Sequence, residues 1–267
     1  MSKNIVLLVI DPQNDFCDPN GALYVNGAEH DMERLGKFVD QYGSKFSDIH
    51  VTMDTHSSFD IAHPIYWKDS TGKHPDPFTI ISKADVESGK WMPVIPAFQQ
   101  RTMDYVSDLE SKGKYPLCIW NPHCLKGSTG HAVHPALYKS LVKWETSIPA
   151  IVNYVTKGTN PFTEHYSAIK AEVEDPSDPH SQINTELINS LMQADEILIA
   201  GEAGSHCVAN TIFDIADEFG DDSYVSKMVL LEDCISPVQG FENLQDDFIS
   251  KMTARGMKVT TTEKFVI

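Results

Sequence analysis

IVLLVI, residues 5–10, runs directly into Asp11, and this junction is the best guide to the fold. Six consecutive apolar residues, four of them β-branched, are typical of a strand buried on both faces, as in the parallel sheet of an α/β protein. Ligands of such sheets bind beyond the carboxyl ends of the strands. The carboxylate of Asp11 therefore stands where an α/β protein carries its functional side chains.

Strand and helix signals alternate through the rest of the chain. Short apolar runs predict further strands at residues 48–53, 117–120, 151–155, 196–200, 226–231 and 257–261. Apolar side chains spaced three and four apart predict helices at residues 30–42, 97–110, 181–194, 206–219 and 241–252. Repeated strand–helix units indicate a largely parallel sheet with helices on both faces.

The length of 267 residues and the 41% apolar content are sufficient for one large hydrophobic core. Residues 57–116 break the alternation, because they are rich in proline and carry little strand signal. We expect their apolar content to be too low for a core of their own. We expect a single domain over residues 1–267 with a long insertion at about 57–116, and long insertions often form lids or binding loops.

Charge and composition exclude several classes of partner. The net charge of −17 disfavours nucleic acid and anionic membrane surfaces. The longest apolar run has six residues, far short of the roughly 20 that a transmembrane helix needs. The amino terminus does not resemble a signal peptide, and the five cysteines are scattered without a CxxC pair. We therefore expect a cytoplasmic protein with reduced cysteines.

Cys207 lies between the predicted strand at 196–200 and the predicted helix at 206–219. A thiol at a helix N-terminus feels the positive end of the macrodipole, which is expected to lower its pKa. Small residues between positions 201 and 205 leave backbone N–H groups free to bind an oxyanion. The alternative is a structural cysteine that packs under the helix, which is the commoner role of a free cysteine.

Two charged residues would suit a nucleophilic thiol. Asp11 is able to accept the thiol proton, and Lys157, which follows the predicted strand at 151–155, would stabilise both anions. Each residue also has an ordinary alternative. Asp11 begins a stretch rich in turn residues, and a lysine is by default a solvated surface residue.

Asp54-Thr55-His56 follows the second predicted strand. In an extended segment the side chains of Asp54 and His56 point to the same face. His63 and His123 are further candidate ligands, and a carboxylate–imidazole set suits Zn²⁺, Fe²⁺ or Mn²⁺. Because the chain has 11 histidines, an Asp-x-His pair alone is a weak signal.

Four segments together form a recognisable pattern: VIDPQNDF (9–16), MDTH (53–56), WNPHCLKGSTG (120–130) and GEAGSHCV (201–208). With these segments the sequence resembles the isochorismatase-like cysteine hydrolases and, within them, the nicotinamidases. The first and last segments are typical of the superfamily. The second and third are typical of its metal-dependent nicotinamidase branch. The resemblance spans residues 4–260 apart from the 57–116 insertion.

The resemblance implies a three-layer α/β/α fold with a mostly parallel six-stranded sheet. It also implies that Cys207 is the nucleophile, Asp11 the base and Lys157 the third catalytic residue. The backbone N–H groups of Ala203 and Cys207 would form the oxyanion hole, with a cis peptide just before Ala203.

The resemblance further implies one divalent metal ion, Zn²⁺ in preference to Fe²⁺ or Mn²⁺. The implied ligands are Asp54, His56 and His123, with His63 near the position of an additional family histidine. Phe16 and Trp120 would sandwich a pyridine ring, and offset stacking of such rings adds about 0.5–1.5 kcal/mol beyond area burial.

The implied activity is the deamidation of nicotinamide to nicotinate and ammonia through a cysteine thioester, a step of NAD salvage. The partner is then a small-molecule amide, and a homo-oligomer stays open. The 57–116 insertion is longer than in compact nicotinamidases, so it is expected to reshape the pocket mouth, admit a larger amide or form an oligomer interface. Glu202, Gly204 and Ser205 are unusual beside the nucleophile, which bears on substrate specificity.

Three alternative functions are compatible with the sequence. The first is a related amidohydrolase that acts on another aromatic amide or on a carbamoyl or ureido compound. The second is a metallohydrolase whose ion activates water, and the third is a non-catalytic scaffold. The joint presence of a metal-type set and an aromatic pair favours the pyridine amide. The set Asp11, Lys157 and Cys207 argues against the scaffold, since buried charges are costly unless paired.

Overall fold

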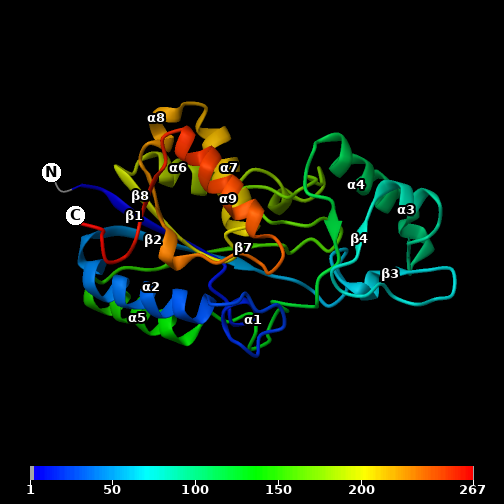
Figure 1. Ribbon diagram of the computed structural model, residues 1–267, viewed down its shortest axis with the longest axis horizontal. Coiled ribbons are helices and arrows are strands. Elements are labelled where there is room, and N and C mark those ends of the chain that lie inside the picture. The colour runs from blue at the N-terminus through cyan, green and yellow to red at the C-terminus, as the bar shows by residue number, and fades with distance from the viewer. Residues whose placement is uncertain (1–2, 267) are drawn as a thin grey trace.

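The computed structural model describes residues 3–266, and its centre is a six-stranded sheet in which all strands run parallel (Figure 1). The strand order is β10-β9-β8-β1-β2-β7. The bounds are β1 (Ile5–Ile10), β2 (Phe46–Asp54), β7 (Asn153–Lys157), β8 (Glu196–Gly201), β9 (Met228–Leu231) and β10 (Lys258–Thr260). Every residue of β1 is buried, as its apolar run predicts.

Helices cover both faces of the sheet, which confirms the three-layer α/β/α fold (Figure 1). One face carries α2 (Ala28–Tyr42) and α5 (Pro135–Ser147), and the other carries α6 (Thr185–Met192), α7 (Cys207–Phe219) and α9 (Glu242–Ala254). Two one-turn helices are α1 (Asn14–Cys17) and α8 (Asp222–Val225). The 3₁₀ turns are η1 (Gly43–Lys45), η2 (Pro64–Tyr66), η3 (Pro96–Phe98), η4 (Pro179–Ser181) and η5 (Glu232–Cys234).

Helix α5 is absent from the elements that we expected. Its signal is nevertheless present, because Leu137, Leu141 and Trp144 are buried at offsets of four and seven residues. Pro135 occupies the first turn, where its missing N–H and fixed φ are compatible with a helix.

Two strand predictions need correction. Residues 117–120 do not join the central sheet, because β6 (Leu117–Cys118) pairs antiparallel with β4 (Ile80–Ile81) in a separate two-stranded sheet. Strand β7 begins two residues later than expected. Lys157 is therefore the last residue of a strand and not the first residue after it.

Residues 57–116 form what we call the inserted lobe, at the right of Figure 1. It contains β3 (Trp67–Lys68), β5 (Met92–Pro93), α3 (Lys83–Glu87) and α4 (Gln99–Ser111), and β3 pairs antiparallel with β5. The lobe has its own hydrophobic cluster, which includes Tyr66, Trp67, Tyr105 and Leu109. The expectation that this segment lacks a core was wrong, because a few large aromatic side chains bury much area without a periodic pattern.

Backbone hydrogen bonds bring the two ends of the lobe together. The N–H of His56 donates to the carbonyl of Cys124 over 3.1 Å, and the N–H of Lys126 donates back to His56 over 3.0 Å. The N–H of Trp120 donates to Ala62 over 2.8 Å. The insertion therefore leaves the β2 end and the 120–126 segment side by side.

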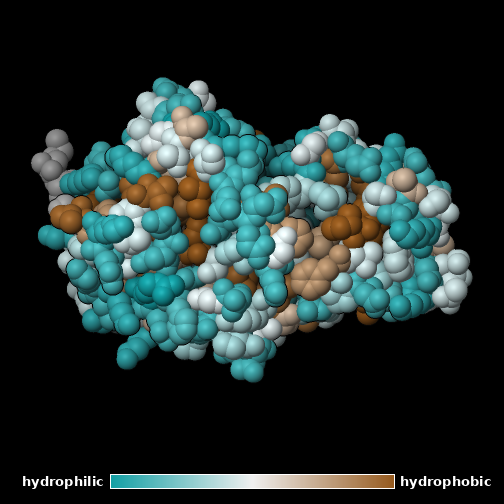
Figure 2. Space-filling view, in the orientation of Figure 1, coloured by the Kyte–Doolittle hydropathy of each residue, from teal (hydrophilic) through white to brown (hydrophobic). Residues whose placement is uncertain are grey.

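Hydrophilic residues predominate on the face shown in Figure 2, with smaller hydrophobic patches between them. None of the helices formed by residues 3–266 combines the length and the apolar character needed to cross a membrane.

Candidate active site

The carboxyl ends of four neighbouring strands gather four polar residues at one rim of the sheet. Asp11 follows β1, Asp54 ends β2, Lys157 ends β7, and Cys207 begins α7 just after β8. All four side chains are buried. The register of the parallel sheet places these residues together although they are separated by up to 196 positions in the sequence.

The ammonium group of Lys157 lies at the centre of this group. Its Nζ is 2.9 Å from Oδ2 of Asp11, 2.9 Å from Oδ1 of Asp54 and 3.6 Å from Sγ of Cys207. It also donates to the carbonyl oxygen of His165 over 2.8 Å. Burial alone would lower the pKa of Lys157, but the two carboxylates raise it well above its ordinary value. Lys157 is thus a buried cation, and the interpretation as a surface lysine was wrong.

Asp11 is held in place by Thr52 of the neighbouring strand β2. The Thr52 hydroxyl accepts a hydrogen bond from the Asp11 backbone N–H over 3.0 Å and donates to the Asp11 carboxylate. Burial raises the pKa of Asp11, and Lys157 offsets only part of this effect. Asp11 is therefore a stronger base than an exposed aspartate.

Cys207 is the first residue of α7, but the pKa of its thiol does not fall below the ordinary value for a cysteine. Burial raises the pKa well above the ordinary value, and a hydrogen bond to Asp11 acts in the same direction against the lowering by Lys157. The expectation that the helix macrodipole sets this pKa was wrong, because desolvation is the larger effect here. The resting thiol keeps its proton, so it needs a base to become a nucleophile.

The backbone N–H groups of Ala203 and Cys207 follow the carboxyl end of β8. Among residues 3–266, neither the N–H of Ala203 nor that of Cys207 donates a backbone hydrogen bond. The Glu202–Ala203 peptide is cis, as the resemblance implied. Gly201 has φ of 114°, and a Cβ at this position would lie 2.0 Å from the carbonyl oxygen of Ile10. Only glycine allows the chain to pass this close to β1.

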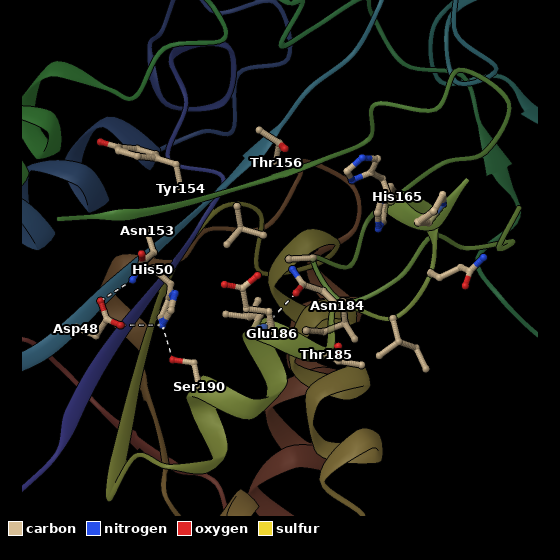
Figure 3. Close-up of a pocket in the computed structure, with 18 of the residues that line it drawn as sticks. Asp48, His50, Asn153, Tyr154, Thr156, His165, Asn184, Thr185, Glu186 and Ser190 are labelled. Atoms are coloured by element: carbon tan, nitrogen blue, oxygen red, sulfur yellow. Dashed lines mark hydrogen bonds and ion pairs between the residues drawn. The ribbon is translucent and has the colours of Figure 1, made fainter. Parts of the chain in front are cut away.

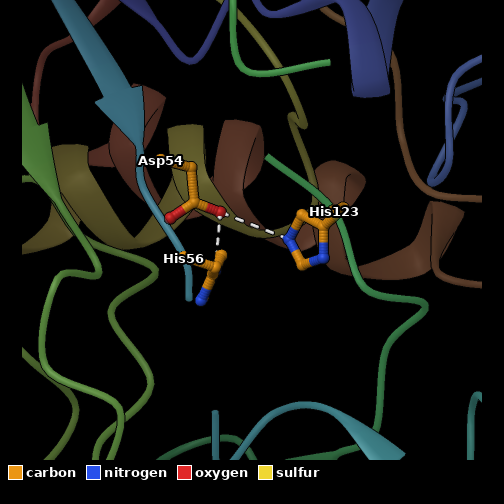
Figure 4. Close-up of side chains that lie close together, drawn as sticks. All are labelled: Asp54, His56 and His123. Atoms are coloured by element: carbon orange, nitrogen blue, oxygen red, sulfur yellow. Dashed lines mark hydrogen bonds and ion pairs between the residues drawn. The ribbon is translucent and has the colours of Figure 1, made fainter. Parts of the chain in front are cut away.

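Asp54, His56 and His123 form a compact set of metal-type ligands (Figure 4). Oδ2 of Asp54 is 3.1 Å from Nε2 of His56 and 3.3 Å from Nε2 of His123. Burial opposes ionisation of Asp54, but His56 and Lys157 lower its pKa well below the ordinary value. The carboxylate therefore stays charged, as a metal ligand must be.

The other ring nitrogen of each histidine has a fixed partner. Nδ1 of His56 is 3.0 Å from the carboxylate of Asp60, and Nδ1 of His123 is 2.8 Å from the carbonyl oxygen of Asn121. Such contacts fix the ring orientation of metal-binding histidines. Both Nε2 atoms consequently point at Asp54, which fits a divalent transition-metal ion.

His63 stands beside this set. Its ring centroid is 5.0 Å from that of His56 and 5.5 Å from that of His123. Its Nε2 is buried without a hydrogen-bond partner in the described part of the chain. Burial, together with His56 and His123, lowers the pKa of His63 to about 4. The neutral imidazole with a free nitrogen suits a fourth ligand, although His63 lies outside the compact three-residue set.

A pocket opens onto Cys207 and the metal-type set. Its walls are formed by Phe16, Leu23, Asp54, Trp120, His123, Glu164, Tyr166, Ala203, His206, Cys207 and Val238. Both aromatic residues expected around a pyridine ring, Phe16 and Trp120, are thus in its walls. The indole N–H of Trp120 donates to the hydroxyl of Tyr166 over 3.1 Å, which fixes the plane of that ring.

Sequence reasoning missed Asp60, Glu164, Tyr166 and His206. Glu164 and Tyr166 belong to the irregular segment that follows β7, where neither period nor turn chemistry indicates a direction for a side chain. His206 adjoins the nucleophile, and burial lowers its pKa to about 4, so it is a neutral wall residue. Asp60 lies in the irregular segment after β2, where a four-residue spacing from His56 predicts no contact.

A larger groove of about 700 Å³ lies along β7, away from Cys207 (Figure 3). In it, Nε2 of His50 is 3.0 Å from Oγ of Ser190 and 3.5 Å from Oδ2 of Asp48. A Ser-His-Asp relay needs the carboxylate on the opposite ring nitrogen. Because both contacts use Nε2, this trio is not such a relay.

Fold and site together define a three-layer α/β/α protein with a buried thiol, a buried carboxylate and a buried lysine beside an Asp/His/His set. No protein-family model matches the chain. A nicotinamidase/pyrazinamidase of Mycobacterium tuberculosis is 29% identical over 210 residues, which are 78% of this chain and 76% of that protein. A nicotinamidase of Acinetobacter baylyi is 26% identical over 84% of this chain and 79% of that protein.

Solved structures agree on the fold. The yeast nicotinamidase superposes with a TM-score of 0.66 at 20% identity, covering 96% of this chain and 99% of that one. The pyrazinamidase of Pyrococcus horikoshii in complex with zinc superposes with a TM-score of 0.57 at 18% identity, covering 97% and 99%. The similarity to nicotinamidases that the four sequence segments indicated is confirmed.

Proposed function

We propose that this protein is a metal-dependent amidohydrolase that converts nicotinamide to nicotinate and ammonia through a thioester on Cys207, as a step of NAD salvage. The observation that carries the proposal is the position of Lys157. Its single ammonium group contacts the base, the thiol and Asp54 of the metal-type set. The nucleophile and the metal-type residues therefore belong to one site.

The first half-reaction uses Asp11 as a base. Asp11 takes the proton of the Cys207 thiol, and Lys157 stabilises the resulting thiolate. The thiolate attacks the amide carbon, while the free N–H groups of Ala203 and Cys207 bind the oxyanion. Asp11 then returns the proton to the departing nitrogen, so that ammonia leaves and a thioester remains on Cys207.

The second half-reaction releases the acid. Asp11 accepts a proton from a water molecule, and the hydroxide attacks the thioester carbon. The same two backbone N–H groups stabilise the second oxyanion. The Cys207–carbon bond breaks, nicotinic acid leaves and loses its carboxyl proton to solvent to become nicotinate, and the proton on Asp11 returns to the thiolate. Each step is carried by groups that lie at the rim of the sheet.

Asp54, His56 and His123 would hold the divalent ion, with His63 as a further ligand. When bound, the ion supplies a Lewis acid that orients a pyridine nitrogen and withdraws electron density from the ring. Zn²⁺ is our first choice, because carboxylate and imidazole ligands suit it and a pyrazinamidase of this fold has been seen with zinc. Fe²⁺ and Mn²⁺ also match the ligand set.

The walls of the pocket support an aromatic substrate. We propose that Phe16 and Trp120 stack on the two faces of the pyridine ring, each from a different side of the pocket. The hydroxyl of Tyr166 holds Trp120 in position. An aliphatic carbamoyl compound would gain little from two such rings, so a flat amide is the better match.

Ammonia release from nicotinamide tests the proposal. The purified protein is assayed as isolated, after removal of metal with a chelator, and after addition of Zn²⁺. We expect release that disappears on chelation and returns with Zn²⁺. Absence of release by metal-loaded protein would contradict nicotinamide as the substrate.

A related aromatic amide is the second candidate. The observation that favours it is Phe78 of the inserted lobe, whose ring centroid lies 5.6 Å from that of Trp120 in an edge-on contact. The lobe therefore contributes directly to the surroundings of the pocket. Turnover of a substituted pyridine or benzene carboxamide well above that of nicotinamide would establish this candidate.

A further inference from the structure

Glu164 is a buried acid in the wall of the pocket that the mechanism above does not use. Only 4% of its surface is exposed, and it lines the same pocket as Asp54, His123 and Cys207. One of its oxygens, Oε1, accepts a hydrogen bond from the backbone N–H of His165 over 2.9 Å. The other, Oε2, is buried and has no hydrogen-bond partner among the described residues.

The position of this free oxygen is fixed from both ends of the residue. The backbone N–H of Glu164 donates to the hydroxyl of Tyr105 over 3.1 Å, and Oε1 is held by His165. A buried polar atom without a partner is costly, and in folded proteins such atoms are nearly always satisfied. A fixed, unsatisfied acceptor in a pocket wall is therefore suited to a donor that comes from outside the chain.

The distribution of charge around the pocket also supports a bound group near Glu164. Asp11, Asp54, Asp60 and Glu164 are four buried carboxylates, and the ammonium group of Lys157 contacts two of them, Asp11 and Asp54. A divalent ion at Asp54, His56 and His123 would reduce this excess of negative charge. Burial raises the pKa of Glu164, whereas a divalent ion beside it would favour the ionised form, whose free oxygen is a strong acceptor.

We propose that Glu164 is a ligand-binding residue of this pocket, whose Oε2 accepts a hydrogen bond from the bound group. The donor is either the amide N–H of the substrate or a water molecule on the divalent ion. Both sources present the same chemistry, a polarised hydrogen next to Asp54 and Cys207. The inference rests on the proposed function, because it assigns a partner within that site.

The substitution Glu164→Gln is a sharp test. Since Oε1 must remain an acceptor for the N–H of His165, the amide places its NH₂ group where Oε2 stands. The free acceptor becomes a donor with almost no change of volume. Glu164→Met removes the acceptor without adding a donor, and serves if the glutamine variant does not fold.

Glu172→Gln is the matched control. Glu172 is 2% exposed, neither of its oxygens accepts a hydrogen bond among residues 3–266, and Oε2 lies 3.4 Å from Nζ of Lys114. It does not line the pocket. A general effect of neutralising a buried carboxylate would therefore appear in both variants, whereas an effect of the pocket acceptor appears only at position 164.

Two measurements distinguish the sources of the donor. Zn²⁺ affinity is measured by competition with a chromogenic chelator, and KM and kcat are measured for nicotinamide with the Zn²⁺-loaded protein. If the donor is the substrate amide, Glu164→Gln raises KM at least tenfold and leaves Zn²⁺ affinity unchanged. If the donor is water on the ion, Zn²⁺ affinity falls about 10- to 100-fold.

If Glu164→Gln leaves both Zn²⁺ affinity and KM unchanged, the proposal is overturned. It is also overturned if Glu172→Gln changes Zn²⁺ affinity or KM as much as Glu164→Gln does. The proposed function fails in a different way. A native protein that binds Zn²⁺ but releases no ammonia from nicotinamide contradicts that function, while a selective loss of Zn²⁺ affinity in Glu164→Gln would still support the role of Glu164.

Discussion

The central sheet and the inserted lobe each bury a hydrophobic cluster, but they build it in different ways. The sheet joins strands that are distant in sequence and brings Asp11, Asp54, Lys157 and Cys207 to one rim. The lobe is made of neighbouring segments with two-residue strands and a few large aromatic side chains. Reactive groups thus gather where distant strands end. A long insertion is tolerated beside them because its own ends are hydrogen-bonded together at His56 and Cys124.

The largest expected effect comes from breaking the charge balance at the rim of the sheet. Lys157→Met leaves Asp11 and Asp54 buried and without their shared cation. We expect a loss of about 3–5 kcal/mol in the free energy of unfolding, because an uncompensated buried charge is costly. Urea denaturation at neutral pH measures this loss.

The same variant should also lose nearly all turnover. Lys227→Met is its control, since Lys227 lies half-buried near Met192 and Ala194 and far along the chain from the rim. Equal destabilisation by the two substitutions would show that the rim of the sheet has no special charge balance.

The independence of the lobe is tested by removing one of its core side chains. Leu109→Ala empties part of the lobe cluster and is expected to cost about 3 kcal/mol, within the range for buried leucines. Because the lobe has its own core, hydrogen exchange should accelerate mainly in α4 and its neighbours. Equal loss of protection in β1 would instead show that lobe and sheet form one cooperative unit.

The junction between the two regions contains a titrating carboxyl group. Glu172 lies 3.4 Å from Lys114, at the end of the lobe, and burial raises its pKa to about 7 despite that lysine. A raised carboxyl pKa means that stability is fully present below the unfolded value of about 4.3 and is lost as the pH rises toward 7. Glu172→Gln should remove this loss.

We therefore expect the glutamine variant to gain roughly 2–3 kcal/mol relative to the native protein between pH 4.5 and pH 8, from the linkage of pKa to stability. Thermal unfolding of both proteins across this pH range measures the gain. A constant difference at all pH values would contradict a titration of Glu172 in this window.

The smallest expected effect concerns the contact between lobe and pocket. Phe78 has φ of 66°, a left-handed conformation that is unfavourable for a bulky residue. Phe78→Ala and Phe78→Gly both remove the ring, but only glycine accepts this φ freely. The glycine variant should be the more stable by about 1 kcal/mol. Denaturant midpoints decide this, and equal stability of the two variants would show that the backbone at position 78 relaxes.

Much of the sheet was predictable from the sequence because it depends on local pattern. The apolar run at 5–10 and the helical spacing at 30–42 each define an element without reference to the rest of the chain. The positions of Asp11, Asp54 and Cys207 follow from strand ends alone, since parallel strands share one rim. The roles given to these residues remain proposals, as does the cytoplasmic location.

What the sequence could not show depends on packing between distant segments. The burial of Lys157 requires both Asp11 and Asp54, and the high pKa of the Cys207 thiol results from desolvation that no motif reveals. The direction of Glu164 is set by contacts with Tyr105 and His165 in an irregular segment. The core of the lobe could not be predicted either, because its aromatic residues are spread over 60 positions and show no helical or strand period. Helix α5 is different, because the spacing of Leu137, Leu141 and Trp144 is a local pattern that the sequence itself contains.

The central claim is that Cys207 carries the chemistry and the metal-type set serves it. The direct test is ammonia release from nicotinamide by Zn²⁺-loaded native protein and by Zn²⁺-loaded Cys207→Ala, with the metal content of both measured. We predict that the native protein releases ammonia and that the alanine variant keeps its Zn²⁺ and releases almost none. Substantial turnover by Cys207→Ala would contradict the account and assign the reaction to metal-activated water.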